Sequence, residues 1–208
     1  EGKSVVISTG MATIEEIKDA LSILEKNGMK KEEITILHCN TEYPTPYEDV
    51  NLNAFYQLKE LFSDYNLGFS DHSAGYFAGL AAVPYGITFI EKHFTLNKNF
   101  EGPDHKASVT PEELKLLCEG IRAVEKSLGS SEKIVTVSEA KNKIVARKSI
   151  IAARPIKKGE IYTIENLTTK RPGNGISPMC WYDILGKDAE MDFEEDQLIQ
   201  DSRFSNQE

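Results

Sequence analysis

The sequence predicts an α/β protein that comprises the C-terminal half of a (β/α)₈ TIM barrel, followed by a small β-rich domain. Three observations predict this fold. Short apolar runs of β-branched residues alternate four times with stretches of helical periodicity. Polar residues gather directly after the carboxyl ends of these runs. Beyond about residue 130, the helical periodicity gives way to short pieces separated by turns.

The first two units are well delimited. Residues 4–8 (SVVIS) have the pattern of a buried strand, and apolar residues then recur at helical spacing. Thr13 and Glu16 form a capping box at the start of that helix, and Gly28 suits its end. A second strand is predicted over 34–38 and a second helix over 51–65.

The third and fourth units follow the same plan. Residues 67–71 predict a strand, and the small residues of 74–83 predict a short helix. Residues 86–94 predict the fourth strand. Thr110 and Pro111 then open a helix with a capping box, and Gly129 closes it.

Strands this apolar, alternating with helices, indicate a parallel sheet with helical crossovers. A doubly wound sheet and a barrel both fit that alternation. No strand is followed by the glycine-rich phosphate turn of a dinucleotide fold, whereas polar residues collect where a barrel carries its catalytic face. We therefore predict half a barrel over 1–130, and since the chain begins without Met in mid-alternation, we expect it to be a piece of a longer protein.

The remainder is predicted as a polar linker over 131–145, either a helix or a tether, and a second domain over 146–208, built from short β pieces. Only residues 181–185 suggest a helical turn there.

Composition narrows the function classes. The chain has 208 residues, 40% of them hydrophobic and 27% charged, which is ordinary for a globular protein. A net charge of -9 argues against nucleic-acid binding, and without an apolar run of about 18 residues we expect no membrane span. No secretory signal opens the chain, and Cys39, Cys118 and Cys180 fit neither a disulfide framework nor a zinc knuckle, so we expect a cytoplasmic protein.

Two histidines follow neighbouring predicted strands: His72 in FSDHS and His93 in EKHFT. Because parallel strands end at the same edge of a sheet, their imidazoles can converge. Two imidazoles, with other positions left to water or substrate, suit Mn²⁺ or a similar ion better than structural zinc. Spacing alone leaves a shared metal and two hydrogen-bonded structural histidines equally open.

Two loops carry further polar groups. Prolines hold HCNTEYPTPYEDVNL (38–52) extended, so it either covers the barrel end or presents Thr41 and Tyr43 to sugar hydroxyls. The loop NFEGPDHKAS (99–108), with Asp104, is either solvated or substrate-binding.

Six motifs occur in order along the chain: STGM, LHCNTEYPTPYEDVNL, FSDHS, EKHFT, GPDHKAS and KRPGNGISP. Together they resemble the sialic acid synthase family, which makes N-acetylneuraminate, legionaminate and related nonulosonates. The resemblance covers essentially the whole chain and implies that the small domain is an antifreeze-like (SAF) domain. It also implies condensation of phosphoenolpyruvate with an N-acyl-mannosamine-type sugar and release of phosphate.

The resemblance implies roles for individual residues. His72 and His93 match the family's ligands of a divalent metal, Mn²⁺ or another such as Mg²⁺ or Co²⁺, and with Glu91 they would be catalytic. Ser70 matches a position near phosphoenolpyruvate. The role of Asp71, within FSDHS, stays open: it either orients an imidazole through a hydrogen bond or does not act on the histidines.

Acceptor recognition is implied for Glu91, Asp104 and Tyr43. Thr41 stands where neuraminate-making members commonly carry Asn, so CNTEYP looks more like the branch that acts on 2,4-diacetamido-2,4,6-trideoxymannose than the branch that acts on N-acetylmannosamine. Arg171 matches an arginine that one subunit places over its partner's barrel, which implies a domain-swapped homodimer. The family's catalytic glutamate and phosphate-binding lysine come from earlier strands, so we expect this segment alone to be poorly active.

Two other function classes remain open from the residues. A barrel metallohydrolase or aldolase could use the same histidines, but it usually needs further ligands or a Schiff-base lysine. Lys92 is the only lysine at a strand end, and it should face away from Glu91 and His93. A non-catalytic binding module built on the SAF domain is the third class, although the charged KKGE and EEDQ offer no flat, weakly charged face for ice.

Overall fold

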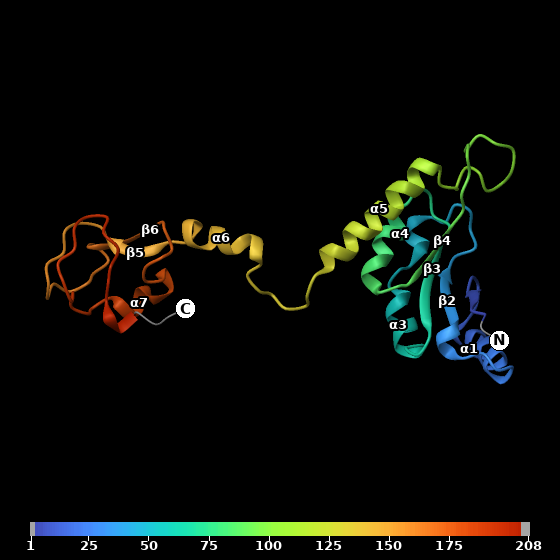
Figure 1. The fold of residues 1–208 in the computed structure, drawn as a ribbon, viewed down its shortest axis with the longest axis horizontal. Coiled ribbons are helices and arrows are strands. Elements are labelled where there is room, and N and C mark those ends of the chain that lie inside the picture. The colour runs from blue at the N-terminus through green and yellow to red at the C-terminus, as the bar shows by residue number, and fades with distance from the viewer. Residues whose placement is uncertain (1–2, 205–208) are drawn as a thin grey trace. The chain divides into compact units, whose positions relative to one another are not determined.

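The computed structural model describes residues 3–204 and divides into two compact units, one up to Ser130 and one from Ser131 (Figure 1). Within the described residues, no helix has both the length and the apolar character needed to cross a bilayer. Each unit is described separately below.

The first unit is built on a four-stranded parallel sheet in the order β1-β2-β3-β4. Its strands are β1 (Val5–Ser8), β2 (Ile34–Cys39), β3 (Asn66–Asp71) and β4 (Phe89–Lys92). Strand order follows chain order with a helical segment in each crossover, which is the pattern of consecutive barrel units. The half-barrel prediction is confirmed, and a doubly wound sheet, which would reverse its strand order, is excluded.

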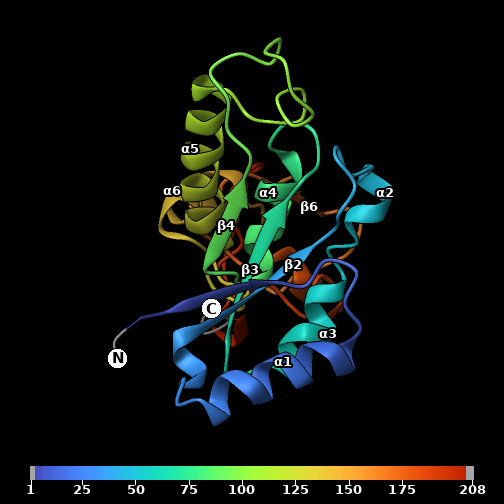
Figure 2. The same cartoon turned by 90° about the vertical axis from the view of Figure 1, so that its right-hand side faces the viewer.

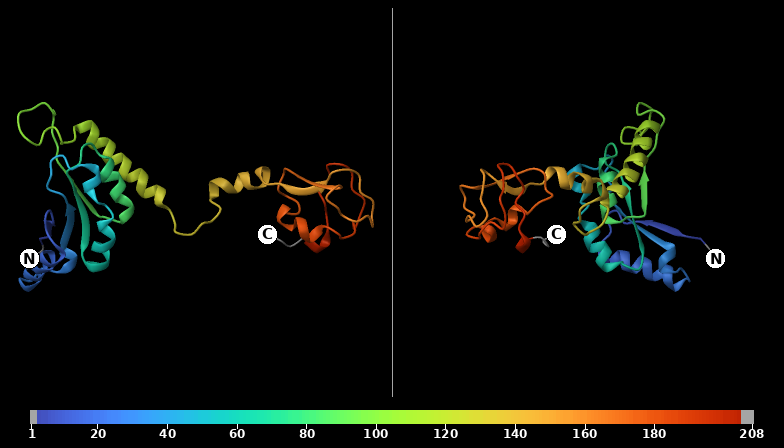
Figure 3. Two further views of the ribbon diagram at one scale, coloured as in Figure 1. Left: turned by 180° about the vertical axis from the view of Figure 1, so that it is seen from behind. Right: turned by 60° about the vertical axis from the view of Figure 1, so that its left-hand side comes forward.

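Helices cover one face of this sheet, as the views in Figure 1 and Figure 3 show. The longer ones are α1 (Ile14–Lys26), α3 (Ala54–Leu61), α4 (Phe77–Ala82) and α5 (Pro111–Leu128). Shorter turns complete the crossovers: α2 (Tyr47–Val50) and the 3₁₀ turns η1 (Lys31–Glu33) and η2 (Val83–Tyr85). The loops that follow β2, β3 and β4 gather at the carboxyl edge of the sheet (Figure 2).

Local chemistry explains where the elements begin and end. Both predicted capping boxes are present, on Thr13 at α1 and on Thr110 at α5. The helix predicted over 51–65 was too long at both ends: Asn51 adopts a left-handed conformation (φ 48°) that separates α2 from α3, and α3 ends at Leu61. Likewise the helix predicted from residue 74 begins only at Phe77, since Gly75 has φ 70°.

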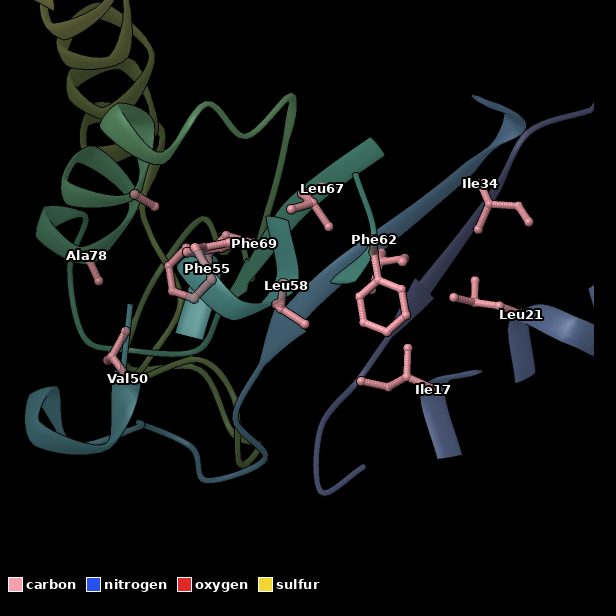
Figure 4. Packing of buried hydrophobic residues seen from close by; sticks show 12 residues of the cluster. Ile17, Leu21, Ile34, Val50, Phe55, Leu58, Phe62, Leu67, Phe69 and Ala78 are labelled. Carbon is pink, nitrogen blue, oxygen red and sulfur yellow. The ribbon is translucent and has the colours of Figure 1, made fainter. Parts of the chain in front are cut away.

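The core of this unit lies between the sheet and the helices. Phe55 of α3 packs edge-on against Phe69 of β3, and Phe62 lies beside Ile17 and Leu21 of α1 (Figure 4). All five are at most 5% exposed. At about 25 cal/mol per Å², burying such side chains is the main term that holds the helices on this face.

Alternation along the strands separates the two faces of the sheet. Leu67, Phe69 and Asp71 of β3 lie on the helix face, so Gly68 and Ser70 lie on the other. A Cβ at Gly68 would lie 2.7 Å from the carbonyl oxygen of Phe89, so β4 approaches β3 too closely there for any side chain.

The second unit opens with α6 (Val137–Ala146), in the segment predicted as a linker. Strands β5 (Ser149–Ala152) and β6 (Leu167–Lys170) pair antiparallel, and isolated bridges join the rest. Its short helical turns are α7 (Trp181–Ile184), η3 (Pro178–Cys180) and η4 (Ser202–Phe204). Turns and single bridges around a core that includes Ile150, Tyr162 and Phe193 account for the fragmented β pattern of the sequence.

Candidate functional site

His72 and His93 stand side by side at the carboxyl edge of the sheet. Asp71 of β3 and Lys92 of β4 are partners in the parallel register, and each histidine is the next residue along its strand. The ring centroids lie 5.2 Å apart with the ring planes at 80°. The convergence that the strand spacing predicted is present in the structure.

The hydrogen bonds of His72 assign its tautomer. Nδ1 lies 2.5 Å from the carbonyl oxygen of Asn40, and because a carbonyl only accepts, Nδ1 carries the proton. Nε2 therefore carries a free lone pair, and it lies 3.3 Å from the hydroxyl oxygen of Ser70. That hydroxyl donates its own proton to Glu91 Oε1 at 2.7 Å. The lone pairs of His72 Nε2 and Ser70 Oγ therefore face each other beside the Glu91 carboxylate, with no proton between them. Such nitrogen and oxygen lone pairs are donors that a divalent cation can bind.

His93 is the more exposed ring, with 32% of its side chain accessible. Its Nδ1 lies 3.7 Å from Asp104 Oδ2, a carboxylate from the loop after β4. His93 and residues of the same loop, among them His105 and Ser108, line an open cavity of about 260 Å³. This cavity is open to a substrate that reaches His93.

Tyr43, from the loop after β2, covers both histidines. Its ring centroid lies 4.2 Å from that of His72 and 5.3 Å from that of His93. Partial burial raises the pKa of the Tyr43 phenol, and the negative charge of Asp104 and Glu91 adds to the rise. The phenol therefore stays protonated near neutral pH and can donate a hydrogen bond to a sugar oxygen.

Backbone contacts fix this loop on the turn that carries His72. Thr45 N donates to the carbonyl oxygen of His72 at 2.9 Å, and the Tyr47 hydroxyl donates to the carbonyl oxygen of Ala74 at 2.8 Å. Thr45 also forms an isolated parallel bridge with Ser73. The rigidity that its prolines predicted therefore comes equally from pairing with the neighbouring turn.

Thr41 lies at the edge of this group. It is exposed, and its Cγ2 would lie only 2.6 Å from a Cβ at Gly10, so it packs against the STGM turn that follows β1. Arg171 belongs to the second unit, where its Nε donates to the carbonyl oxygen of Ala146 at 3.0 Å. The structure thus brings together Ser70, His72, Glu91, His93, Tyr43 and Asp104, with Thr41 nearby. The roles of all eight residues stay predictions.

Two groups near the histidines escaped the sequence reasoning. The carbonyl of Asn40 is backbone and leaves no trace in the residue type. The thiol of Cys39 lies 3.7 Å from His72 Nδ1, and burial raises its pKa, with the charge of Glu91 adding to this and a hydrogen bond with Ser70 opposing it. Alternation of residues could have placed Cys39 on this face, because it follows Leu37 by two.

Asp71 does not contact an imidazole. It faces the helices, where its Oδ2 lies 3.0 Å from Lys92 Nζ and its Oδ1 accepts from the backbone N and the hydroxyl of Ser73. Burial lowers the pKa of Lys92, and the Asp71 carboxylate opposes that change. Lys92 points away from Glu91 and His93, as predicted, which removes it as a Schiff-base candidate at the barrel mouth.

The donor set fits a divalent ion bound by two imidazoles. Within residues 3–204, no three or more His, Cys, Asp or Glu side chains form a group that could hold a metal on their own. Any ion held by His72 and His93 would therefore complete its coordination with water, substrate or groups such as the Ser70 hydroxyl.

The sequence of this chain matches the models of known protein families and is similar to several known proteins. The NeuB family model matches residues 1–133, and the SAF domain model matches residues 147–205. The chain is 52% identical to N,N'-diacetyllegionaminic acid synthase of Campylobacter jejuni, over 96% of this chain and 59% of that protein. It is 38% identical to a pseudaminic acid synthase of the same species, over 98% of this chain and 58% of that protein.

A solved structure agrees. The N-acetylneuraminic acid synthetase of Leptospira borgpetersenii, crystallised with citrate, superposes with a TM-score of 0.59 and 35% identity, covering 67% of this chain and 47% of that one. The chain thus spans less than two thirds of the length of the relatives named here. The half-barrel, the site at its carboxyl edge and the matched family models together show that this chain belongs to the NeuB family and carries a SAF domain.

Proposed function

We propose that the protein containing this chain is a nonulosonate synthase that condenses phosphoenolpyruvate with an N-acyl-mannosamine-type sugar and releases phosphate. The observation that carries the proposal is the meeting of His72 and His93 beneath Tyr43, beside the Ser70–Glu91 pair. The relatives are named as synthases of such sugars, which favours an enzyme over a non-catalytic binding module.

In this mechanism, His72 Nε2 and an imidazole nitrogen of His93 would hold a divalent ion, for which we propose Mn²⁺, with Mg²⁺ or Co²⁺ as substitutes. Such an ion supplies Lewis-acid polarisation of the open-chain sugar's aldehyde. The carbonyl of Asn40 keeps the His72 proton on Nδ1, so that Nε2 stays available. Asp104 and the Tyr43 phenol bind sugar hydroxyls and orient the aldehyde carbon toward phosphoenolpyruvate.

The bond-forming steps follow from the substrates. C3 of phosphoenolpyruvate attacks the aldehyde carbon, and positive charge develops at C2. Water adds at C2, and the resulting tetrahedral intermediate expels phosphate. The Ser70–Glu91 pair lies beside His72 Nε2, where it can orient phosphoenolpyruvate and the acceptor sugar. Holding two substrates in attack geometry accounts for a large part of the acceleration in such reactions.

For the acceptor we propose 2,4-diacetamido-2,4,6-trideoxymannose rather than N-acetylmannosamine. Two observations support this choice: Thr41, in the loop after β2, stands where neuraminate-making members of the family commonly carry Asn, and a legionaminic acid synthase is 52% identical to this chain. The test uses the full protein, including whatever precedes Glu1, with phosphoenolpyruvate, Mn²⁺ and each sugar in turn. Phosphate release and the mass of the product would identify the acceptor. Phosphate release with neither sugar nor any related N-acyl-mannosamine would reject the synthase.

We further propose a cytoplasmic, domain-swapped homodimer in which Arg171 of each subunit serves the barrel of the other. Mixing His72→Ala and Arg171→Ala chains tests it, because only a swapped heterodimer contains one site with both residues intact. Random pairing should then recover up to about a quarter of the wild-type activity. Activity no higher than that of the separate variants would place Arg171 in the site of its own chain or outside it.

A further inference from the structure

The residues that precede the two histidines form a buried ion pair. Asp71 Oδ2 lies 3.0 Å from Lys92 Nζ, and the two side chains are 0% and 3% exposed. They are register partners on neighbouring strands, one residue before His72 and His93 respectively. Strand alternation turns this pair toward the helices and the histidines toward the barrel mouth.

Helices α4 and α5 close over the pair. A Cβ on Gly79 of α4 would lie 3.5 Å from Asp71 Oδ2 and 3.0 Å from Leu117 Cδ1 of α5. Removing two charges from water is costly, and an apolar pair of the same volume often stabilises a protein as well or better. Stability alone therefore does not account for charges at this position.

The pair holds the backbone that follows His72. Asp71 Oδ1 accepts from Ser73 N at 2.9 Å and from Ser73 Oγ at 2.6 Å, and Lys92 Nζ donates to the carbonyl oxygen of Ser73. Both peptide groups next to Ser73 are thereby fixed from the helix side. From the opposite side, Thr45 N fixes the carbonyl oxygen of His72 at 2.9 Å.

We propose that Asp71 and Lys92 are a positioning pair: they lock the register of β3 against β4 and hold the His72–Ser73 turn, which sets the separation of the two imidazoles. The pair touches no substrate and takes no part in proton transfer. This inference rests on the proposed function insofar as the two histidines bind one metal ion.

The central test compares three variants of the full protein: Asp71→Asn, Lys92→Met and the double variant Asp71→Asn/Lys92→Met. Each single change leaves one buried polar or charged group without its partner, so both should lower the melting temperature. The double variant removes both charges at nearly unchanged volume and should recover most of that loss. Its Mn²⁺ affinity, measured by calorimetry, should nevertheless stay about 10-fold or more below wild type, since support of metal ligands is typically worth that much.

Lys98→Met is the matched control. It removes the cation of a partly exposed ion pair, Lys98 Nζ to Glu113 Oε1 at 2.7 Å, a few residues after His93 and without contact to Ser73. Its Mn²⁺ affinity should equal that of wild type. A double variant with a wild-type melting temperature and a Mn²⁺ affinity within about twofold of wild type would overturn the positioning role.

A second readout separates this inference from the metal proposal. In the metal-free protein, imidazole ¹H–¹⁵N spectra should show His72 protonated on Nδ1 in wild type and in Lys98→Met. The double variant should populate both tautomers, because the Ser73 carbonyl oxygen loses its Lys92 donor and an amide replaces the carboxylate that accepts from Ser73, which loosens the turn that aims the ring at Asn40. If the wild-type protein binds no Mn²⁺, the metal proposal fails, and these spectra alone then test whether Asp71 and Lys92 position His72. An unchanged His72 tautomer in the double variant would reject that role.

Discussion

At the residue scale, the chemistry of the site depends on which nitrogen of His72 carries its proton. The carbonyl of Asn40 fixes that proton on Nδ1 and leaves Nε2 to face Ser70. The spacing of FSDHS and EKHFT was enough to predict that the two rings converge. It could not assign the tautomer, because the partner is a backbone group from another strand end.

The same limit applies to Asp71. Its adjacency to His72 in sequence left support of an imidazole open, whereas the structure turns it to the other face, onto Lys92. Only the parallel register of β3 and β4 reveals that pairing. Residue types next to a functional side chain thus say little until strand alternation and register are known.

Thr41 gives a prediction at this scale. Thr41→Asn exchanges a short hydroxyl for an amide in the loop after β2, and under the proposed function it should shift the ratio of kcat/KM for the two acceptor sugars at least about 10-fold toward N-acetylmannosamine. The measurement is phosphate release with each sugar across a range of concentrations. Thr41→Val keeps the shape and removes the hydroxyl, so it separates the loss of a hydrogen bond from a change in size. An unchanged ratio in Thr41→Asn would remove this residue from acceptor selection.

At the element scale, the carboxyl edges of β2, β3 and β4 and the loop that follows each supply the described site. Alternating apolar runs predicted these strands and their parallel arrangement. Two helices were predicted too early or too long, because positive φ angles at Asn51 and Gly75 interrupt stretches whose apolar periodicity continues. Periodicity reports which face is buried and is insensitive to such breaks.

Gly68 gives a prediction for β3. In Gly68→Ala, the new methyl would meet Leu37 Cδ2 at 2.5 Å and the carbonyl oxygen of Phe89 at 2.7 Å, and the backbone atom cannot move aside. The substitution should lower the free energy of unfolding by about 1–3 kcal/mol, measured by urea denaturation. Ser8→Thr adds a methyl group at an exposed position of β1 and serves as the control. Equal stability of the two variants would contradict the close approach of β4 to β3.

At the scale of the whole molecule, the chain combines a half-barrel with a SAF domain. The change of pattern near residue 130 predicted two parts, and six ordered motifs pointed to the family that the comparisons show. The structure of the segment 131–145 was harder to predict, since a polar stretch with a capping Thr136 is compatible with either an extended tether or the helix α6 that it forms. The proposed role of Arg171 requires two subunits to assemble, which no pattern in one sequence reports.

The second unit should have its own acid sensitivity. Burial alone would raise the pKa of Asp201, but Arg203, bonded to both carboxylate oxygens at 2.8 and 2.6 Å, holds that pKa below its usual 3.8. Because the pKa of Asp201 is lower in the folded than in the unfolded protein, its carboxylate stabilises the fold fully at pH values above the unfolded-state pKa of 3.8. This stabilisation is lost as the pH falls from 3.8 through the folded-state pKa. The melting temperature of this unit should therefore fall in that acid range.

The variant Asp201→Asn tests the same ion pair at neutral pH. Replacing this fully buried carboxylate should cost about 1–3 kcal/mol of the unit's unfolding free energy and flatten its acid dependence. Asp192→Asn breaks the exposed pair with Lys157, which water and salt screen, and should therefore cost much less than Asp201→Asn. Both losses of unfolding free energy are measured by calorimetry. Equal losses in the two variants would show that burial of the Asp201–Arg203 pair adds nothing to stability.

The central claim is that His72 and His93 jointly hold one divalent ion on which a synthase reaction depends. Its most direct test is phosphate release by the full protein from phosphoenolpyruvate and the diacetamido sugar, before and after chelation, in wild type, His72→Ala and His93→Gln. We predict that stripping abolishes the activity, that Mn²⁺ restores it in wild type, and that Mn²⁺ fails to restore it in either variant. Full activity after metal stripping, or Mn²⁺-dependent activity undiminished in His72→Ala, would contradict the account.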